Sequence, residues 1–148
     1  SAIQEVRRIV DDLGSPALDA LGLVEALRIR ADRAGRRSDG EALQIVLEAG
    51  ALPPLSPAVE QAAYRIATEA ITNVVRHSRA TSMVVRLGAD ATGLHCEVLD
   101  DGALTGAWRP GVGITGMCER AAQLGGSCEV GPGPRGGEVR VWLPMVLA

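Results

Sequence analysis

The 148 residues have the length of one ordinary domain, and 47% hydrophobic against 22% charged residues is the balance of a soluble globular fold. A net charge of −3, an aromatic content of 2% and the absence of lysine exclude a basic, base-stacking nucleic-acid surface and a GxxxxGK[ST] phosphate loop. No apolar run reaches the ~18 residues that a membrane span requires, so we expect no membrane contact by this chain.

Apolar residues at helical spacing predict a first helix over residues 1–13, which has no cap before it and is expected to be the end of a longer helix. "GSP" at 14–16 then starts a second helix, in which apolar residues recur as far as Gly35. "EALQIVLEA" predicts a strand. "PPLSP" at 53–57 predicts a rigid turn, and its Ser-Pro pair starts a third helix over about 58–78.

The third helix has two chemically different sides. At 100° per residue, Glu69 and Asn73 lie one turn apart on a polar side that also holds Arg76. A glutamate and an asparagine at this spacing, taken alone, are typical of an ordinary solvated helix face. The opposite arc is apolar and consists of Ala63, Ala67, Ala70, Ile71 and Val74.

The second half of the chain is richer in strands. "TSMVVRLGAD" and "GLHCEVLDD" predict two strands that pair across "GADATG", and Leu94, Cys96 and Val98 alternate with polar or exposed positions such as His95. A glycine-containing loop over 102–112 leads into the helix "ITGMCERAAQL", followed by "GGSCEV", a Gly/Pro turn and the strand "EVRVWLP". The whole pattern predicts an α/β two-layer sandwich, with helices packed on one face of a mixed sheet.

The cysteines predict no cross-link. Cys96, Cys118 and Cys128 are odd in number and show no CxxC spacing, so neither a disulfide framework nor a zinc site is expected. Cys118 and Cys128 are interpreted as small core side chains. We therefore expect a reduced, cytoplasmic compartment for this chain, within a full-length protein that is free to carry a membrane anchor elsewhere.

Two glycine-containing segments give the polar helix face a chemical context. "EVLDDG" ends a strand in two acids and a glycine, and "GVGITG" at 111–116 opens a helix, where free backbone N–H groups and the helix dipole favour phosphate. A dinucleotide-binding fingerprint is disfavoured, because no strand leads directly into Gly111 and too little chain remains for a doubly wound sheet.

Taken in order, E-x-x-x-N on a helix, D-x-G after a strand and G-x-G-x-x-G opening a later helix resemble the nucleotide-binding boxes of the Bergerat-fold superfamily of gyrases, heat-shock chaperones, histidine kinases and mismatch-repair ATPases. "RIATEAITNVVRHSRAT", "LDDG", "GVGITGMCERAAQLGG" and "RGGEVRVWLP" resemble the catalytic domain of nitrate-sensor-class histidine kinases. On this resemblance, residues 1–15 are the end of a dimerisation helix with its linker, and residues 16–148 are the ATP-binding catalytic domain.

The resemblance implies binding of ATP or ADP with Mg²⁺, and transfer of the γ-phosphate to a histidine on the kinase's own dimerisation domain, in a homodimer that signals to a response regulator. Asp100 would accept a hydrogen bond from the adenine amine, Asn73 would offer an oxygen to Mg²⁺, and Glu69 would orient or deprotonate the attacking group. Residues 103–112 would form a lid. The other implied nucleotide contacts are Gly102, Arg76, His77, Gly111, Val112, Gly113, Ile114 and Gly116.

Three positions depart from the family's pattern. Leu104 replaces the second glycine of D-x-G-x-G, Val112 replaces a frequent histidine, and Glu138 replaces the threonine of a closing "GT". Two alternatives therefore stand beside the histidine kinase: a free-standing anti-sigma-type serine kinase, which the dimerisation-helix remnant disfavours, and a non-catalytic nucleotide-sensing module, which Glu138 would suit.

Overall fold

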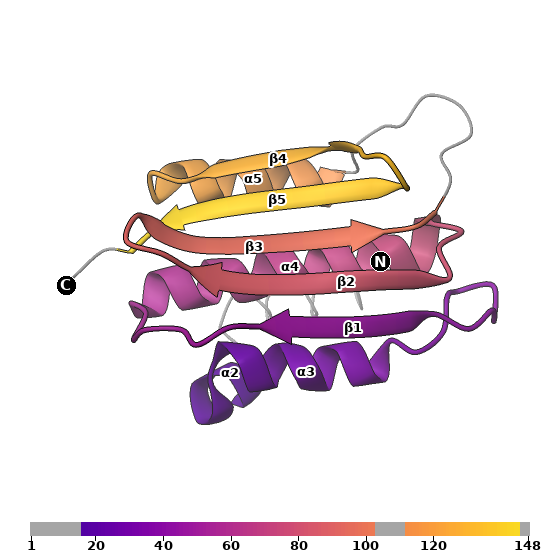
Figure 1. The fold of residues 1–148 in the computed structure, drawn as a ribbon, viewed down its shortest axis with the longest axis horizontal. Helices are drawn as coiled ribbons and strands as arrows, with labels where there is room; N and C mark the ends of the chain where they lie inside the picture. The colour runs from indigo at the N-terminus through magenta and orange to yellow at the C-terminus, as the bar shows by residue number, and fades with distance from the viewer. Residues whose placement is uncertain (1–15, 103–111, 146–148) are drawn as a thin grey trace, which may run out of the picture.

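The computed structural model describes residues 16–102 and 112–145, and in it helices pack on one face of a five-stranded sheet (Figure 1). This confirms the predicted α/β two-layer class. The predicted helix over 1–13 and the segment 103–111 lie outside the described residues. The helices are α2 (Pro16–Leu21), α3 (Leu23–Arg33), α4 (Pro57–His77) and α5 (Val112–Gln123); the strands are β1 (Gln44–Ala49), β2 (Ser82–Ala89), β3 (Gly93–Asp100), β4 (Ser127–Pro132) and β5 (Gly137–Pro144).

The strand order is β1-β2-β3-β5-β4, in which β1 runs parallel to β2 and the other neighbours are antiparallel. A parallel pair needs a crossover, which α4 provides. The predicted pairing of β2 with β3 is confirmed. Asp90 closes their turn, because its Oδ1 accepts hydrogen bonds from the backbone N–H groups of Thr92 (2.8 Å) and Gly93 (3.1 Å).

The core lies between the sheet and the helices, and strand alternation directs side chains into it. The predicted apolar arc of α4 is confirmed, since each of its five residues is at most 7% exposed. The strand residues that complete this core are Met83, Val85, Leu87, Leu94, Cys96, Val98, Val139, Val141 and Leu143.

The start of α4 follows from two adjacent residues. Ser56 is the N-cap, and its side-chain oxygen accepts a hydrogen bond from the Val59 backbone N–H at 3.3 Å. Pro57 takes the first helical position, where its missing N–H costs nothing. The sequence prediction of a Ser-Pro start is therefore confirmed.

The predicted second helix is wrong in one respect, because Gly22 divides it into α2 and α3. Gly22 has φ 85° and ψ 174°, a conformation that side chains with a Cβ strongly disfavour. Its N–H still donates to the Leu18 carbonyl and its carbonyl accepts from Ala26, both at 3.0 Å. Apolar spacing continues across Gly22, so the periodicity alone did not reveal the break.

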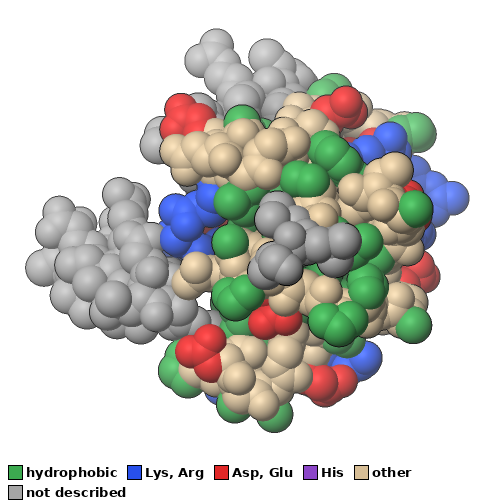
Figure 2. Space-filling model, turned by 90° about the vertical axis from the view of Figure 1, so that its left-hand side faces the viewer, with side chains coloured by type: hydrophobic (Ala, Val, Ile, Leu, Met, Phe, Trp, Pro, Cys, Tyr) green, Lys and Arg blue, Asp and Glu red, His purple; other side chains and the backbone are tan. Residues whose placement is uncertain are grey.

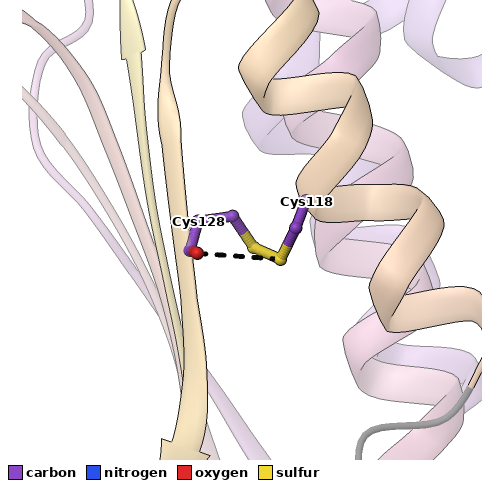
Figure 3. The surroundings of a disulfide bond; sticks show 2 residues. All are labelled: Cys118 and Cys128. Carbon is purple, nitrogen blue, oxygen red and sulfur yellow. Dashed lines mark hydrogen bonds between the residues drawn. A yellow bond between two sulfur atoms is a disulfide. The ribbon is translucent and has the colours of Figure 1, made fainter.

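A disulfide joins Cys118 of α5 to Cys128 of β4 (Figure 3), which contradicts the expectation of unpaired core cysteines. The turn after α5 is tight, with Gly126 N–H donating to the Ala121 carbonyl at 2.8 Å, and it folds β4 back along the helix. The two Cα atoms are thereby brought to 5.0 Å. A spacing of ten residues does not reveal this contact, because it depends on how the helix packs on the strand.

The other face of the sheet carries a row of alternating charges that crosses all five strands. In register, Glu48 lies beside Arg86, Arg86 beside Glu97, Glu97 beside Arg140, and Arg140 beside Glu129. Arg86 Nε is 2.9 Å from Glu48 Oε2, and Arg140 Nε is 3.5 Å from Glu97 Oε2. Opposite charges in register stabilise neighbouring strands and keep this face hydrated.

The end of the sandwich opposite the C-terminus of β3 has no large surface patch of a single sign of charge among the described residues. Figure 2 shows that end, where acidic and basic side chains are interspersed with hydrophobic and polar ones. Within 16–102 and 112–145, no helix combines the length and the apolar character needed to cross a membrane.

Candidate functional site

Asp100, the last residue of β3, lies where β3 and α4 end and β5 begins. Its Oδ1 accepts hydrogen bonds from the Gly102 N–H (2.8 Å), the Gly137 N–H at the start of β5 (3.3 Å) and the hydroxyl of Ser78, which caps α4 (3.4 Å). Its Oδ2 has no hydrogen bond to another described residue. One oxygen therefore fixes the carboxylate, and the other is left as a free acceptor.

Burial raises the pKa of Asp100 above the usual aspartate value, and the hydrogen bonds from Gly102, Gly137 and Ser78 act in the opposite direction. A half-buried carboxylate with one unpaired oxygen is incompletely solvated. It is consequently suited to receive a donor from a ligand that displaces water.

Three glycines allow the chain to pack closely around Asp100. A Cβ at Gly136 would lie 2.5 Å from the Asp100 carbonyl oxygen, and one at Gly137 would lie 2.7 Å from Asp100 Oδ2. A Cβ at Gly102 would collide with the Ser78 hydroxyl. The predicted contact at Gly102 thus lies beside Asp100, whereas Gly136, Gly137 and Ser78 were missed because only the strand pairing brings them there.

The neighbouring Asp101 has a structural role. Its carboxylate accepts hydrogen bonds from the backbone and hydroxyl groups of Thr81 and Ser82, at 2.8–3.1 Å. Burial acts to raise the pKa of Asp101, but these hydrogen bonds outweigh it and lower the pKa. Of the two adjacent acids, Asp100 is therefore the one with an oxygen that makes no hydrogen bond to another described residue.

The polar side of α4 continues from Ser78 back along the helix. Asn73 Nδ2 is buried and has no hydrogen-bond partner among the described residues, which is rare in native proteins and costs about 1–3 kcal/mol. Glu69, one turn earlier, is half-buried, and its carboxylate makes no hydrogen bond or ion pair within the described part of the chain. Arg76 and His77 are exposed in the last turn.

The predicted phosphate side is partly described. Val112, Gly113 and Ile114 form the first turn of α5, whose leading N–H groups have no partner within the helix. Gly116 follows on the same helix and is exposed, whereas Gly111 and all but the last residue of the predicted lid over 103–112 lie outside the described residues. Figure 1 shows the N-terminus of α5 at the same end of the sandwich as the C-terminus of β3 and the last turn of α4.

Glu138 does not face Asp100. Strand alternation places Val139 in the core, and Glu138 lies with Arg140 on the uncovered face of the sheet, where Arg140 Nη2 is 3.0 Å from Glu138 Oε2. The backbone of the preceding Gly137, rather than the side chain of Glu138, contacts the Asp100 carboxylate. The replacement of the family's threonine therefore adds no charge beside Asp100.

A magnesium ion fits these residues only together with phosphate. Among the described residues there is no group of three or more His, Cys, Asp or Glu side chains that could hold a metal ion. Glu69 and Asn73 offer two side chains one turn apart on α4. Mg²⁺ is commonly held by one or two protein groups plus phosphate oxygens and water, so this donor set suits a phosphate-bound ion.

Comparison with known proteins identifies relatives of one kind. The sensor histidine kinase YxjM of Bacillus subtilis (strain 168) is 35% identical over 147 residues, which cover 97% of this chain and 35% of the relative. The chain spans about a third of the length of the curated relatives it matches. No protein-family model matches the chain.

Solved structures share the fold. The histidine kinase domain of the Erythrobacter litoralis EL346 blue-light activated histidine kinase superposes with a TM-score of 0.67 at 17% identity, over 84% of this chain and 59% of that chain. The ATP binding domain of PrrB from Mycobacterium tuberculosis gives a TM-score of 0.51 at 19% identity, over 80% of this chain and 93% of that one.

Proposed function

Because this chain is homologous to sensor histidine kinases over nearly its whole length, we propose that it is the ATP-binding catalytic domain of such a kinase. It binds Mg-ATP and transfers the γ-phosphate to a histidine on the kinase's own dimerisation domain. The observation that carries the proposal is Asp100, whose Oδ1 is held by three donors while Oδ2 has no hydrogen bond to another described residue.

The adenine end of the nucleotide binds at Asp100. Its Oδ2 accepts a hydrogen bond from the exocyclic amine of adenine. A carboxylate has only acceptors, so it cannot form a hydrogen bond with a base that presents a carbonyl oxygen at the same place. Gly102, Gly136 and Gly137 let the backbone pack directly against Asp100, which holds its carboxylate in place for the base.

The phosphate end binds between α4 and the start of α5. The first-turn N–H groups of α5 and the side chains of Arg76 and His77 bind phosphate oxygens. The buried Asn73 amide gains partners there, with its nitrogen donating to phosphate and its oxygen available to Mg²⁺. A bound magnesium ion would supply charge neutralisation of the transferred group. Glu69 orients or deprotonates the attacking histidine.

The wider setting follows from the proposed reaction. We assign residues 1–15 to the end of the dimerisation helix with its linker, and residues 16–148 to the catalytic domain. The full-length kinase acts as a homodimer and passes the phosphoryl group to a response regulator. The domain operates in the cytoplasm, where ATP is available.

The first test is calorimetric titration of the chain with ADP and Mg²⁺, followed by the same titration of Asp100→Asn. An amide in place of the carboxylate turns a donor toward the adenine amine or weakens the acceptor, so affinity should fall by at least about 1–3 kcal/mol. Asp101→Asn is the matched control, because it removes the same charge one residue away and should bind normally. Equal affinity of Asp100→Asn and the unmodified chain would overturn the adenine assignment.

A phosphotransfer assay separates the alternatives. With the dimerisation domain of the same kinase supplied in trans, ATP should label a histidine on that domain. Labelling of serine on a separate protein would instead favour the anti-sigma-type kinase, and nucleotide binding without transfer to any protein would favour the sensing module.

A further inference from the structure

The disulfide between Cys118 and Cys128 connects two elements with different roles. Cys118 lies in the second turn of α5, and Cys128 lies on β4, the edge strand whose only neighbour in the described sheet is β5 (Figure 3). Both side chains are half-buried and pack against the core. The cross-link therefore fixes a helix to the outermost strand of the sheet.

The same geometry accommodates the reduced pair. The Cα separation of 5.0 Å lies within the range for disulfides, and the Cys118 sulfur is 3.7 Å from the Cys128 carbonyl oxygen, which can accept a hydrogen bond from a thiol. Reduction thus leaves the Cys118 thiol with a partner and requires no rearrangement of the backbone. Both oxidation states are compatible with this fold.

The third cysteine is isolated from this chemistry. Cys96 is fully buried in β3, and burial raises the pKa of its thiol to about 12. A thiol with so little thiolate is a poor nucleophile in disulfide exchange. Oxidation and reduction are consequently confined to Cys118 and Cys128.

The cross-link adds a second point at which α5 is held, beyond the turn that follows it. The C-terminal end of this helix is already held by its turn, where Gly125 and Gly126 donate backbone hydrogen bonds to Ala122 and Ala121. Cys118 is the seventh of the twelve residues of α5, so the disulfide holds the middle of the helix, just after the half that carries the first-turn N–H groups. Those groups are the ones assigned to phosphate.

We propose that Cys118 and Cys128 form a redox tether, a reversible disulfide that fixes α5 on β4 and thereby limits movement of its first turn, so that the oxidised chain binds nucleotide more tightly than the reduced chain. This inference rests on the proposed nucleotide site. A thiolate of a dithiol reductant attacks one sulfur of the disulfide, which releases the other cysteine as a thiol and forms a mixed disulfide. The second thiol of the reductant then attacks its own sulfur in the mixed disulfide and releases the remaining cysteine. Two protein thiols and one reductant disulfide result, a transfer of two electrons and two protons.

The test compares the chain oxidised with glutathione disulfide and reduced with dithiothreitol, with the redox state of each sample measured by the mass added on thiol alkylation. Calorimetry with ADP and Mg²⁺ should give an affinity at least about fivefold lower after reduction, the lower limit of typical coupling between sites. Amide hydrogen exchange at residues 112–118 should be slower in the oxidised chain.

Two variants complete the design. Cys118→Ala and Cys128→Ala should each bind ADP as the reduced chain does, and neither should respond to dithiothreitol. Equal affinity and equal exchange in both redox states, or failure of the pair to oxidise, would overturn the redox tether and leave the proposed function intact. Absence of ADP binding in both states would overturn the proposed function as well.

Discussion

Asn73 has a side-chain hydrogen-bond donor that the described fold leaves unsatisfied. Its buried Nδ2 has no partner among the described residues, although the helix around it is well packed. A protein accepts such a cost where a ligand removes it, and the amide offers both a donor and an acceptor. Glu69, one turn away, is half-exposed, so water can reach its carboxylate and it needs no ligand for its own stability.

This difference predicts that the two neighbours fail differently. Asn73→Ala should weaken Mg²⁺-dependent ADP binding together with phosphotransfer, because it removes contacts to the nucleotide. Glu69→Ala should keep most of the affinity and slow transfer to the dimerisation-domain histidine by about 10²- to 10⁴-fold, the usual size of acid–base assistance. The measurements are calorimetric affinity and single-turnover transfer in trans.

Gln61→Ala provides the control for these two variants, since it shortens a partly buried polar side chain on the same helix, three turns before Asn73. It should leave affinity and rate unchanged. Transfer at the unmodified rate in Glu69→Ala would remove the catalytic role of that residue. Near-normal behaviour of both site variants would show that this side of α4 is an ordinary solvated face.

At the scale of elements, the junction between α2 and α3 depends on one backbone conformation. Gly22→Ala should destabilise the chain by about 1–3 kcal/mol, because φ 85° with ψ 174° is nearly restricted to glycine. For a chain of this size, the melting temperature should fall by roughly 2–4 °C for each kcal/mol of lost stability.

Gly35→Ala is the matched control for this variant. Gly35 also has open space around its Cα, but its φ is not positive. An alanine there should be neutral or slightly stabilising, since it reduces the entropy of the unfolded chain. A melting temperature of Gly22→Ala equal to that of Gly35→Ala would show that the backbone at residue 22 has no special requirement.

The elements that the sequence predicted are those with a local cause. Ser56 and Pro57 start α4 through contacts within one turn, and the alternation of Leu94, Cys96 and Val98 directs one side of β3 into the core. Gly22 was missed because the break needs no change in apolar spacing. The disulfide was missed because it depends on the packing of α5 against β4.

The candidate site was predictable to the same extent. Asp100 and Asn73 belong to short motifs, so their positions along the chain carried information. Ser78 and Gly136 stand in longer segments that resemble the family, but no role was predicted for either, because they reach Asp100 only where α4 ends, and β5 begins, beside the C-terminus of β3. Contacts between distant segments are set by sheet order, which local patterns do not specify.

For the molecule as a whole, the location of its histidines predicts an inactive fragment. The sequence contains only His77 and His95. His77 lies in the last turn of α4, where we propose that it contacts the nucleotide, and His95 lies on β3 with Nε2 2.8 Å from Asp90 Oδ2, so neither is on a free dimerisation helix. The chain alone should not become phosphorylated on histidine.

The measurement is incubation with radiolabelled ATP, with and without the dimerisation domain in trans. Label on the isolated chain that is lost in acid and kept in base would refute the expectation. The sample that contains the dimerisation domain is the positive control, because its label should appear there with the same chemical stability.

The parallel pairing of β1 with β2 also has a consequence during synthesis. Residues 44–49 leave the ribosome before β2, their partner in the described sheet, has been synthesised, and the ribosome must first add α4, up to Ser82. At about 5–20 residues per second, this delay lasts roughly 2–8 s. For that time β1 has unpaired backbone groups on both sides, and such strands can pair with other chains. The length of the crossover helix thus sets how long the nascent chain is exposed to misassembly.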